Sequence, residues 1–111
     1  MGKNPEIFLR HILEWIEKLE QYTADVNEED FLSNPEKQDA VVHRIQIISE
    51  ATRHITEEMR SKYPATEWHK IIGMRNLLIH EYFGVDLKLV WIVVQKRIPE
   101  LKKVIQALIK T

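Results

Sequence analysis

Apolar residues recur at spacings of three and four positions along most of this chain, which is the period of one face of an α-helix. Two long stripes show the pattern: Phe8, Ile12, Trp15, Ile16 and Leu19, followed by Val41, Ile45, Ile48, Thr52, Ile55 and Met59. No segment shows the strict alternation of apolar and polar residues that is typical of a half-buried strand. The sequence therefore predicts an all-α protein, an antiparallel bundle of four to five helices.

The first half of the chain contains clear signals for the starts of helices. Asn4-Pro5 and Asn34-Pro35 each combine a capping residue with a proline at the first helical position, where the missing N–H costs no hydrogen bond. These signals predict one helix over about residues 4–25 and a second from residue 35 to just before Tyr63-Pro64. Between them, Asn27 is expected to cap one short helical turn with acidic residues at its start.

The second half of the chain predicts two or three more helices. Thr66 is the cap expected for a third helix, which should end near Gly84, the natural residue for a left-handed position after a helix. Asp86 is expected to cap a fourth helix. Pro99 either kinks that helix or starts a fifth.

Composition excludes several functional classes. With 111 residues, 44% hydrophobic and 30% charged, the chain predicts one soluble domain over residues 1–111. No apolar run approaches the roughly 18 residues of a membrane span, and no secretion signal precedes the first helix, so a cytoplasmic location is expected. The absence of cysteine excludes disulfides and thiolate chemistry. A net charge of −1 argues against a strongly basic nucleic-acid binder, so any RNA contact must be local.

The histidines give no sign of a metal site. His11, His43, His54 and His69 show no spacing such as H-E-x-x-H, so we expect neither a metal nor another cofactor.

The third predicted helix carries an arginine where a core residue is expected. At about 100° per residue, one arc collects Trp68, Ile71, Ile72, Leu78 and Ile79, with Arg75 at its centre and with Met74 and Leu77 outside it. This helix is apolar over most of its circumference, and such a helix is usually buried on all sides. A small bundle rarely surrounds one helix completely, so the sequence predicts that this helix also forms the interface of a homodimer.

The remaining strip of the same helix is polar. His69, Gly73, Asn76 and His80 lie along it, which predicts a small polar cleft beside the buried surface. Structural roles remain open for two of the side chains. Arg75 can reach past its neighbours to solvent or pair with Glu50 or Glu57, and a histidine at a helix C-terminus is favoured by the helix dipole alone.

Arginine and histidine together suit metal-independent cleavage of RNA. The substrate supplies its own nucleophile, the 2′-hydroxyl, and the protein then needs a proton acceptor and a fixed cation for the charge that develops on the phosphate. Arg75 and His80 are five positions apart, however, and so about 140° apart on an ideal helix. A distorted last turn, or arginine from one subunit meeting histidine from the other, would bring them together.

The run Arg75-Asn76-Leu77-Leu78-Ile79-His80-Glu81-Tyr82 resembles the R-x-x-x-x-H-x-Y motif of HepT-like proteins, which belong to the HEPN superfamily of all-helical ribonuclease domains. The resemblance continues through the flanking segments, Ile-Ile-Gly-Met before the motif and Phe-Gly-Val-Asp after it, and covers nearly the whole chain.

This resemblance implies a HEPN-like homodimer that acts as the toxin of a two-gene toxin–antitoxin module. Arg75 and His80 would be the catalytic pair of a metal-independent endoribonuclease acting on tRNA or mRNA, with Asn76 as a supporting active-site residue. The implied partner is a nucleotidyltransferase antitoxin of the MNT type, which would attach AMP to Tyr82 and could form a larger hetero-oligomer with the toxin. The alternative is a non-catalytic HEPN module that binds nucleotide or docks the partner transferase.

Overall fold

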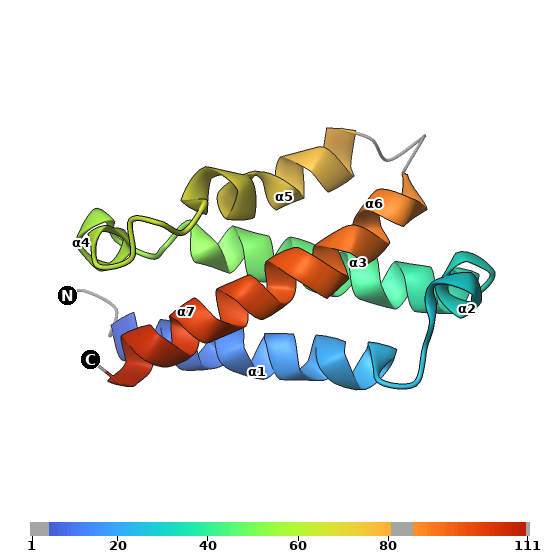
Figure 1. Cartoon of the computed structure of the whole chain (residues 1–111), viewed down its shortest axis with the longest axis horizontal. Coiled ribbons are helices and arrows are strands. Elements are labelled where there is room, and N and C mark those ends of the chain that lie inside the picture. The colour runs from blue at the N-terminus through green and yellow to red at the C-terminus, as the bar shows by residue number, and fades with distance from the viewer. Residues whose placement is uncertain (1–4, 81–85, 111) are drawn as a thin grey trace.

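Four long helical segments run antiparallel to their neighbours and form the body of the structure (Figure 1). The computed structural model describes residues 5–80 and 86–110. Its helices are α1 (Pro5–Thr23), α2 (Glu28–Leu32), α3 (Pro35–Thr52), α4 (Glu57–Ser61), α5 (Trp68–His80), α6 (Leu87–Ile92) and α7 (Ile98–Lys110), and the π-helical segment η2 (Val93–Arg97) joins the last two. These residues contain no strand, which confirms the all-α prediction.

The core lies between α1, α3 and α7. Its fully buried side chains follow the predicted helical spacing: Ile12, Ile16 and Leu19 on α1, Val41, Ile45 and Ile48 on α3, and Ile98, Leu101 and Ile105 on α7. Helix α3 packs against α1 and α5, while α1 also packs against α7. Helix α5 therefore lies at the edge of the bundle, with α3 as its main neighbour among the described contacts (Figure 1).

Three of the predicted helix caps are confirmed. The Asn34 side chain accepts a hydrogen bond from the backbone N–H of Lys37 at 3.0 Å and starts α3. The Asn27 side chain accepts a hydrogen bond from the backbone N–H of Asp30 at 2.8 Å and starts α2. The Asp86 carboxylate accepts from the backbone N–H groups of Lys88 and Leu89 at 3.1 and 3.2 Å and starts α6. Thr66 was the wrong cap, because α5 begins at Trp68 and its first carbonyl acceptor is that of Glu67.

The prediction of a single helix from residue 35 to residue 62 is wrong. Helix α3 ends at Thr52, and α4 begins after Thr56, whose hydroxyl accepts a hydrogen bond from the N–H of Met59 at 3.2 Å. The hydroxyls of Ser49 and Thr52 donate back to carbonyls three residues earlier, an interaction that competes with regular helix. Ile55 is buried within the break and fixes the path of the chain there.

Pro99 lies at the start of the last helix, which is one of the two predicted alternatives. It is the second residue of α7, directly after η2. Proline has no N–H to donate to the carbonyl four residues earlier, and a π-helical turn shifts the hydrogen-bond register by one residue, so the chain remains helical through this point. The segment from Leu87 to Lys110 is thus one long helical arm that crosses the bundle (Figure 1).

Within the described residues, no helix has the length and apolar character that a bilayer crossing requires.

Candidate active site

Helix α5 carries the predicted catalytic residues on its second half. Arg75, Asn76 and His80 all belong to the α-helix, and the helix stays regular up to His80. At about 100° per residue, the Cα atoms of Arg75 and His80 lie about 140° apart around the axis and about 7.5 Å apart along it. The described backbone therefore gives no distorted turn that would align them. Tyr82 lies outside the described residues.

The core-facing side of α5 differs from the predicted arc. Ile71 is fully buried, and Met74 is buried as well, although the sequence placed Met74 outside the arc. Trp68 and Ile72 are only partly buried. The predicted arc was drawn from the positions of all apolar residues of the helix, whereas only the side that faces α3 is buried in the core. Over residues 68–74, the buried face therefore lies on the side of Ile71 and Met74 and not on that of Ile72.

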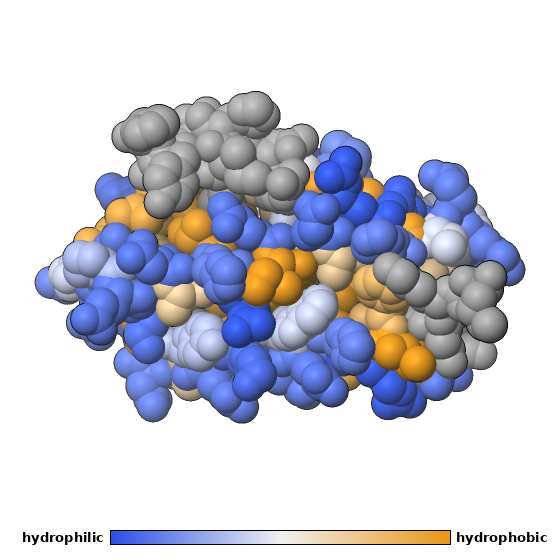
Figure 2. Space-filling view, turned by 180° about the vertical axis from the view of Figure 1, so that it is seen from behind, coloured by the Kyte–Doolittle hydropathy of each residue, from blue (hydrophilic) through white to orange (hydrophobic). Residues whose placement is uncertain are grey.

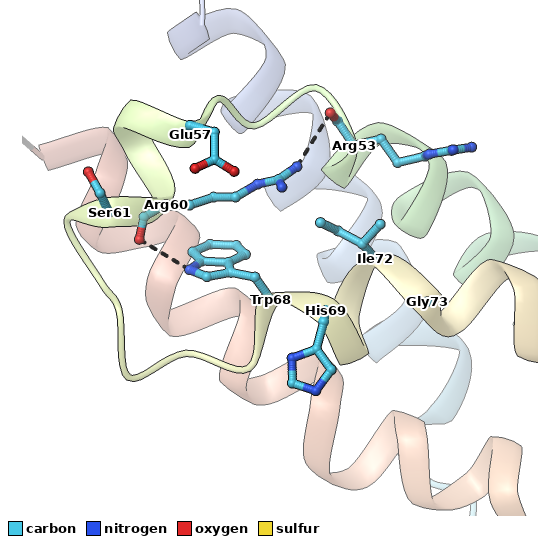
Figure 3. Close-up of a pocket in the computed structure, with 8 residues that line it drawn as sticks. All are labelled: Arg53, Glu57, Arg60, Ser61, Trp68, His69, Ile72 and Gly73. Atoms are coloured by element: carbon cyan, nitrogen blue, oxygen red, sulfur yellow. Dashed lines mark hydrogen bonds between the residues drawn. The ribbon is translucent and has the colours of Figure 1, made fainter.

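A cleft of about 640 Å³ opens where the start of α5 faces α4 (Figure 3). Its walls combine polar and apolar side chains: Arg53, Glu57, Arg60, Ser61, Trp68, His69, Ile72 and Gly73. His69 and Gly73 were the first two members of the predicted polar strip, so the structure places that half of the strip in a cleft. Asn76 and His80 continue the same strip at helical spacing toward the end of α5.

Trp68 holds α4 against α5. Its indole N–H donates to the backbone carbonyls of Arg60 and Tyr63 at 3.2 and 3.1 Å. Figure 3 shows the bond to Arg60, which connects the two walls of the cleft. Because the donor is a rigid, half-buried ring, this contact fixes the position of the last turn of α4 relative to the first turn of α5.

A network of charges ties the start of α5 to the long C-terminal arm. Glu67 accepts hydrogen bonds from Lys70 at 2.7 Å and from Arg97 at 3.0 Å, and Arg97 also contacts Glu100 at 3.3 Å. The hydrogen bonds from Lys70 and Arg97 lower the pKa of Glu67 from 4.5 to about 2. The same bond to Glu67 raises the pKa of Arg97. This network does not follow from the sequence, because its central pair, Glu67 and Arg97, is 30 residues apart.

Glu67→Gln is expected to lower the melting temperature at neutral pH by a few degrees. The folded state keeps the Glu67 carboxylate ionised, since its pKa is depressed there. The stabilisation is therefore complete above pH 4.5 and is lost as the pH falls toward about 2. Thermal unfolding of wild type and variant between neutral pH and pH 3 checks this.

Glu14→Gln, an exposed site on α1, is the matched control for the loss of one carboxylate. A difference between wild type and Glu67→Gln that stays constant down to pH 3 would contradict the assignment.

The described residues offer no obvious metal centre. Nowhere in residues 5–80 and 86–110 do three or more His, Asp or Glu side chains come together in a way that could hold an ion.

Three charged residues of the cleft, Arg53, Glu57 and Arg60, were not identified as site residues from the sequence. The sequence predicted one unbroken helix over this region, and such a helix would not form a cleft with α5. A signal was present, because Thr56-Glu57-Glu58 is a typical helix start. If this signal had been taken as the start of a separate helix, a turn before Glu57 would have been predicted, and with it a short helix that can face α5.

Comparison with known proteins identifies the family. The model of the family described as "Ribonuclease HepT-like" matches residues 12–108. The chain belongs to the HepT-like ribonuclease family. The chain is 50% identical over 103 residues to "Gamma-glutamylcyclotransferase and putative RNase MJ0434" of Methanocaldococcus jannaschii, and this match covers 93% of the chain and 46% of that longer protein.

Other HepT-like relatives match over nearly their full length. "Putative RNase TTE0752" of Caldanaerobacter subterraneus subsp. tengcongensis is 38% identical, covering 97% of the chain and 96% of the relative. "Probable ribonuclease HepT" of Thermococcus cleftensis is 37% identical, covering 92% and 93%. No solved structure gives a significant match.

Proposed function

We propose that this protein is the toxin of a toxin–antitoxin module and acts as a metal-independent endoribonuclease on tRNA or mRNA. The family match over residues 12–108, which includes Arg75 and His80 on one regular helix, is the observation that carries the proposal. Relatives that match along nearly their whole length are named as ribonucleases. The all-helical bundle and the cleft on α5 are consistent with a HEPN-like ribonuclease.

His80 and Arg75 have separate roles in the proposed reaction. His80 takes the proton from the 2′-hydroxyl of the RNA, whose oxygen then forms a bond to phosphorus while the bond to the 5′-oxygen breaks. The leaving 5′-oxygen is protonated in turn. Arg75 stabilises the charge that grows on the phosphate oxygens, since its guanidinium can donate two parallel hydrogen bonds. Asn76 supports the site as a polar neighbour of Arg75.

The active unit in this proposal is a homodimer built on α5. Two observations support it. Helix α5 lies at the edge of the bundle with α3 as its main neighbour, which leaves a side of the helix for a second subunit (Figure 1). The helix is also regular up to His80, so the Cα atoms of Arg75 and His80 in one chain lie on different sides of its axis. Pairing across the two-fold axis resolves this difficulty.

Regulation in this proposal acts on Tyr82, two positions after His80. An antitoxin of the MNT nucleotidyltransferase type transfers AMP from ATP to the Tyr82 hydroxyl and releases pyrophosphate. The added nucleotide brings bulk and negative charge next to the catalytic residues, which repels RNA phosphates. The toxin and antitoxin then form a hetero-oligomer.

RNA cleavage in EDTA tests this function. Purified protein is expected to cleave tRNA or mRNA without a divalent metal, and pretreatment with ATP and an MNT-type enzyme is expected to abolish the activity. The Tyr82→Phe variant should cleave RNA and resist that pretreatment, because it lacks the acceptor hydroxyl. If the wild-type protein leaves both RNA classes intact, the alternative of a non-catalytic module that binds nucleotide or docks the transferase takes its place.

A further inference from the structure

Arg60 is a cation without a carboxylate partner in the described part of the chain. Its Nε is buried and donates no hydrogen bond to a described neighbour, and its Nη2 donates only one long bond of 3.5 Å, to the backbone carbonyl of Arg53. In Figure 3 the side chain extends beside Trp68 toward that carbonyl, along one wall of the cleft. A guanidinium has five N–H donors, so most of its hydrogen-bonding capacity is unused. Such a partly buried cation gains from an anionic ligand.

Arg53 adds a second available cation. Its side chain is 55% exposed, and its ion pair with Glu50 is long, at 3.9 Å, and equally exposed. Exposed pairs of this kind contribute little, so a ligand can replace this one at small cost.

The lining of the cleft has a positive net charge, although the net charge of the whole chain is negative. Arg53 and Arg60 outweigh the single carboxylate of Glu57, which gives the lining a net charge of +1 with His69 counted as neutral, against −1 for the whole chain. Glu57 forms no ion pair with any described residue, so it opposes an anion in the cleft without cancelling either arginine. Trp68 and Ile72 add apolar surface beside these charges, on which a nucleobase can pack.

The cleft and the proposed catalytic residues share helix α5. A Cβ built on Gly73 would find no heavy atom of the described residues within 4 Å, so none of them covers the surface beside this residue. From Gly73, His80 is seven positions further along α5, or about 10 Å at about 1.5 Å per residue. About three stacked nucleotides span this distance at about 3.4 Å each.

We infer that this cleft is an RNA-binding subsite, in which Arg60 and Arg53 hold a backbone phosphate a few nucleotides away from the bond that is cleaved. The inference rests on the proposed ribonuclease function, and it adds a binding role for α4. The two arginines are positioning residues here, because they hold the strand and do not touch the reacting phosphate.

Binding of a non-cleavable RNA tests the subsite. The probe is a fluorescein-labelled single-stranded dodecamer with 2′-O-methyl groups, measured by fluorescence anisotropy at several salt concentrations. Arg53→Gln and Arg60→Gln should each weaken binding about tenfold and reduce the slope of log affinity against log salt by about 0.7, the value for one lost phosphate contact on a single strand. Glu57→Gln should tighten binding about two- to threefold, because it removes a nearby negative charge.

Two controls separate binding from folding and from net charge. Lys18→Gln removes one positive charge from an exposed site in the last third of α1, at the end of the molecule away from α4, and should leave the affinity within about twofold. Cleavage of an RNA dinucleotide, which is too short to reach from His80 to the cleft, should have the same kcat in all four variants. Arg53 is exposed, so Arg53→Gln remains informative even if Arg60→Gln unfolds.

The outcomes distinguish the subsite from the function on which it rests. Equal dodecamer affinity in Arg53→Gln, Arg60→Gln and Lys18→Gln overturns the subsite, whereas RNA cleavage by the wild type would still support the ribonuclease. Loss of dodecamer binding in the arginine variants, with no cleavage of any RNA by the wild type, supports the subsite and overturns the ribonuclease. A wild type that neither binds nor cleaves RNA overturns both.

Discussion

His80→Ala is expected to lower the rate of RNA cleavage by about 10²–10⁴-fold, the usual contribution of a positioned general acid–base. Histidine is the side chain that most readily exchanges a proton near neutral pH, and without it the 2′-hydroxyl must lose its proton to water. Initial rates on a defined RNA in EDTA measure the effect. The variant should remain folded, because alanine is the best helix former and His80 is the last residue of α5.

His43→Ala is the matched control for the loss of a histidine. His43 is exposed on α3, outside the polar strip of α5, and its replacement should leave the cleavage rate unchanged within about twofold. Circular dichroism and light scattering on both variants exclude unfolding or a changed assembly as the cause of any loss. An equal rate of cleavage in wild type and His80→Ala would show that the activity comes from a contaminant, and the proposed mechanism would fall.

The helical stripes predicted most of the fold because they record burial directly. Ile12, Ile16, Ile45 and Ile48 lie at helical spacing in the sequence and are all fully buried in the core. Caps were predicted well wherever the capping side chain accepts a local hydrogen bond, as Asn27 and Asp86 do. These are local interactions between residues close in sequence, and they depend little on the rest of the chain.

The break between α3 and α4 could not be predicted from the apolar stripe, because the stripe continues through it. Ile55 keeps the helical spacing of Ile48 and Thr52, yet it lies in the loop and is buried there. Tertiary packing, rather than local periodicity, decides that the chain turns at this point. The error mattered for the site, since this turn brings Arg60 to the first turn of α5.

The catalytic residues present the opposite case. Their proposed identity follows from a motif and a family, while in the proposed homodimer their geometry depends on an interface that one chain cannot provide. The spacing of Arg75 and His80 predicts that they lie on different sides of a helix. The α-helix is regular up to His80, so the two residues remain on different sides within one subunit. The sequence therefore proposes the chemistry of the site but not its assembly, which in the proposed homodimer depends on how two copies of α5 meet.

Mixing two inactive variants is expected to restore activity. If each active site combines Arg75 of one subunit with His80 of the other, a dimer of one Arg75→Ala chain and one His80→Ala chain contains one intact pair and one doubly defective pair. Random exchange makes about half of the dimers mixed, so about a quarter of the wild-type activity should return. The measurement is cleavage in EDTA after the two purified variants have exchanged subunits, compared with each variant alone.

The same mixture separates the two possible arrangements of the site. If Arg75 and His80 of one subunit act together, every subunit in a mixed dimer lacks one member of the pair, and the mixture stays as inactive as its components. Light scattering before and after mixing, with a tagged variant to show that mixed dimers form, excludes failed exchange as the reason. A mixture that remains inactive although mixed dimers are present would refute pairing between subunits and require α5 to unwind near His80 for catalysis. Recovery would instead explain how a helix that stays regular up to His80 carries a catalytic pair whose members lie on different sides of it.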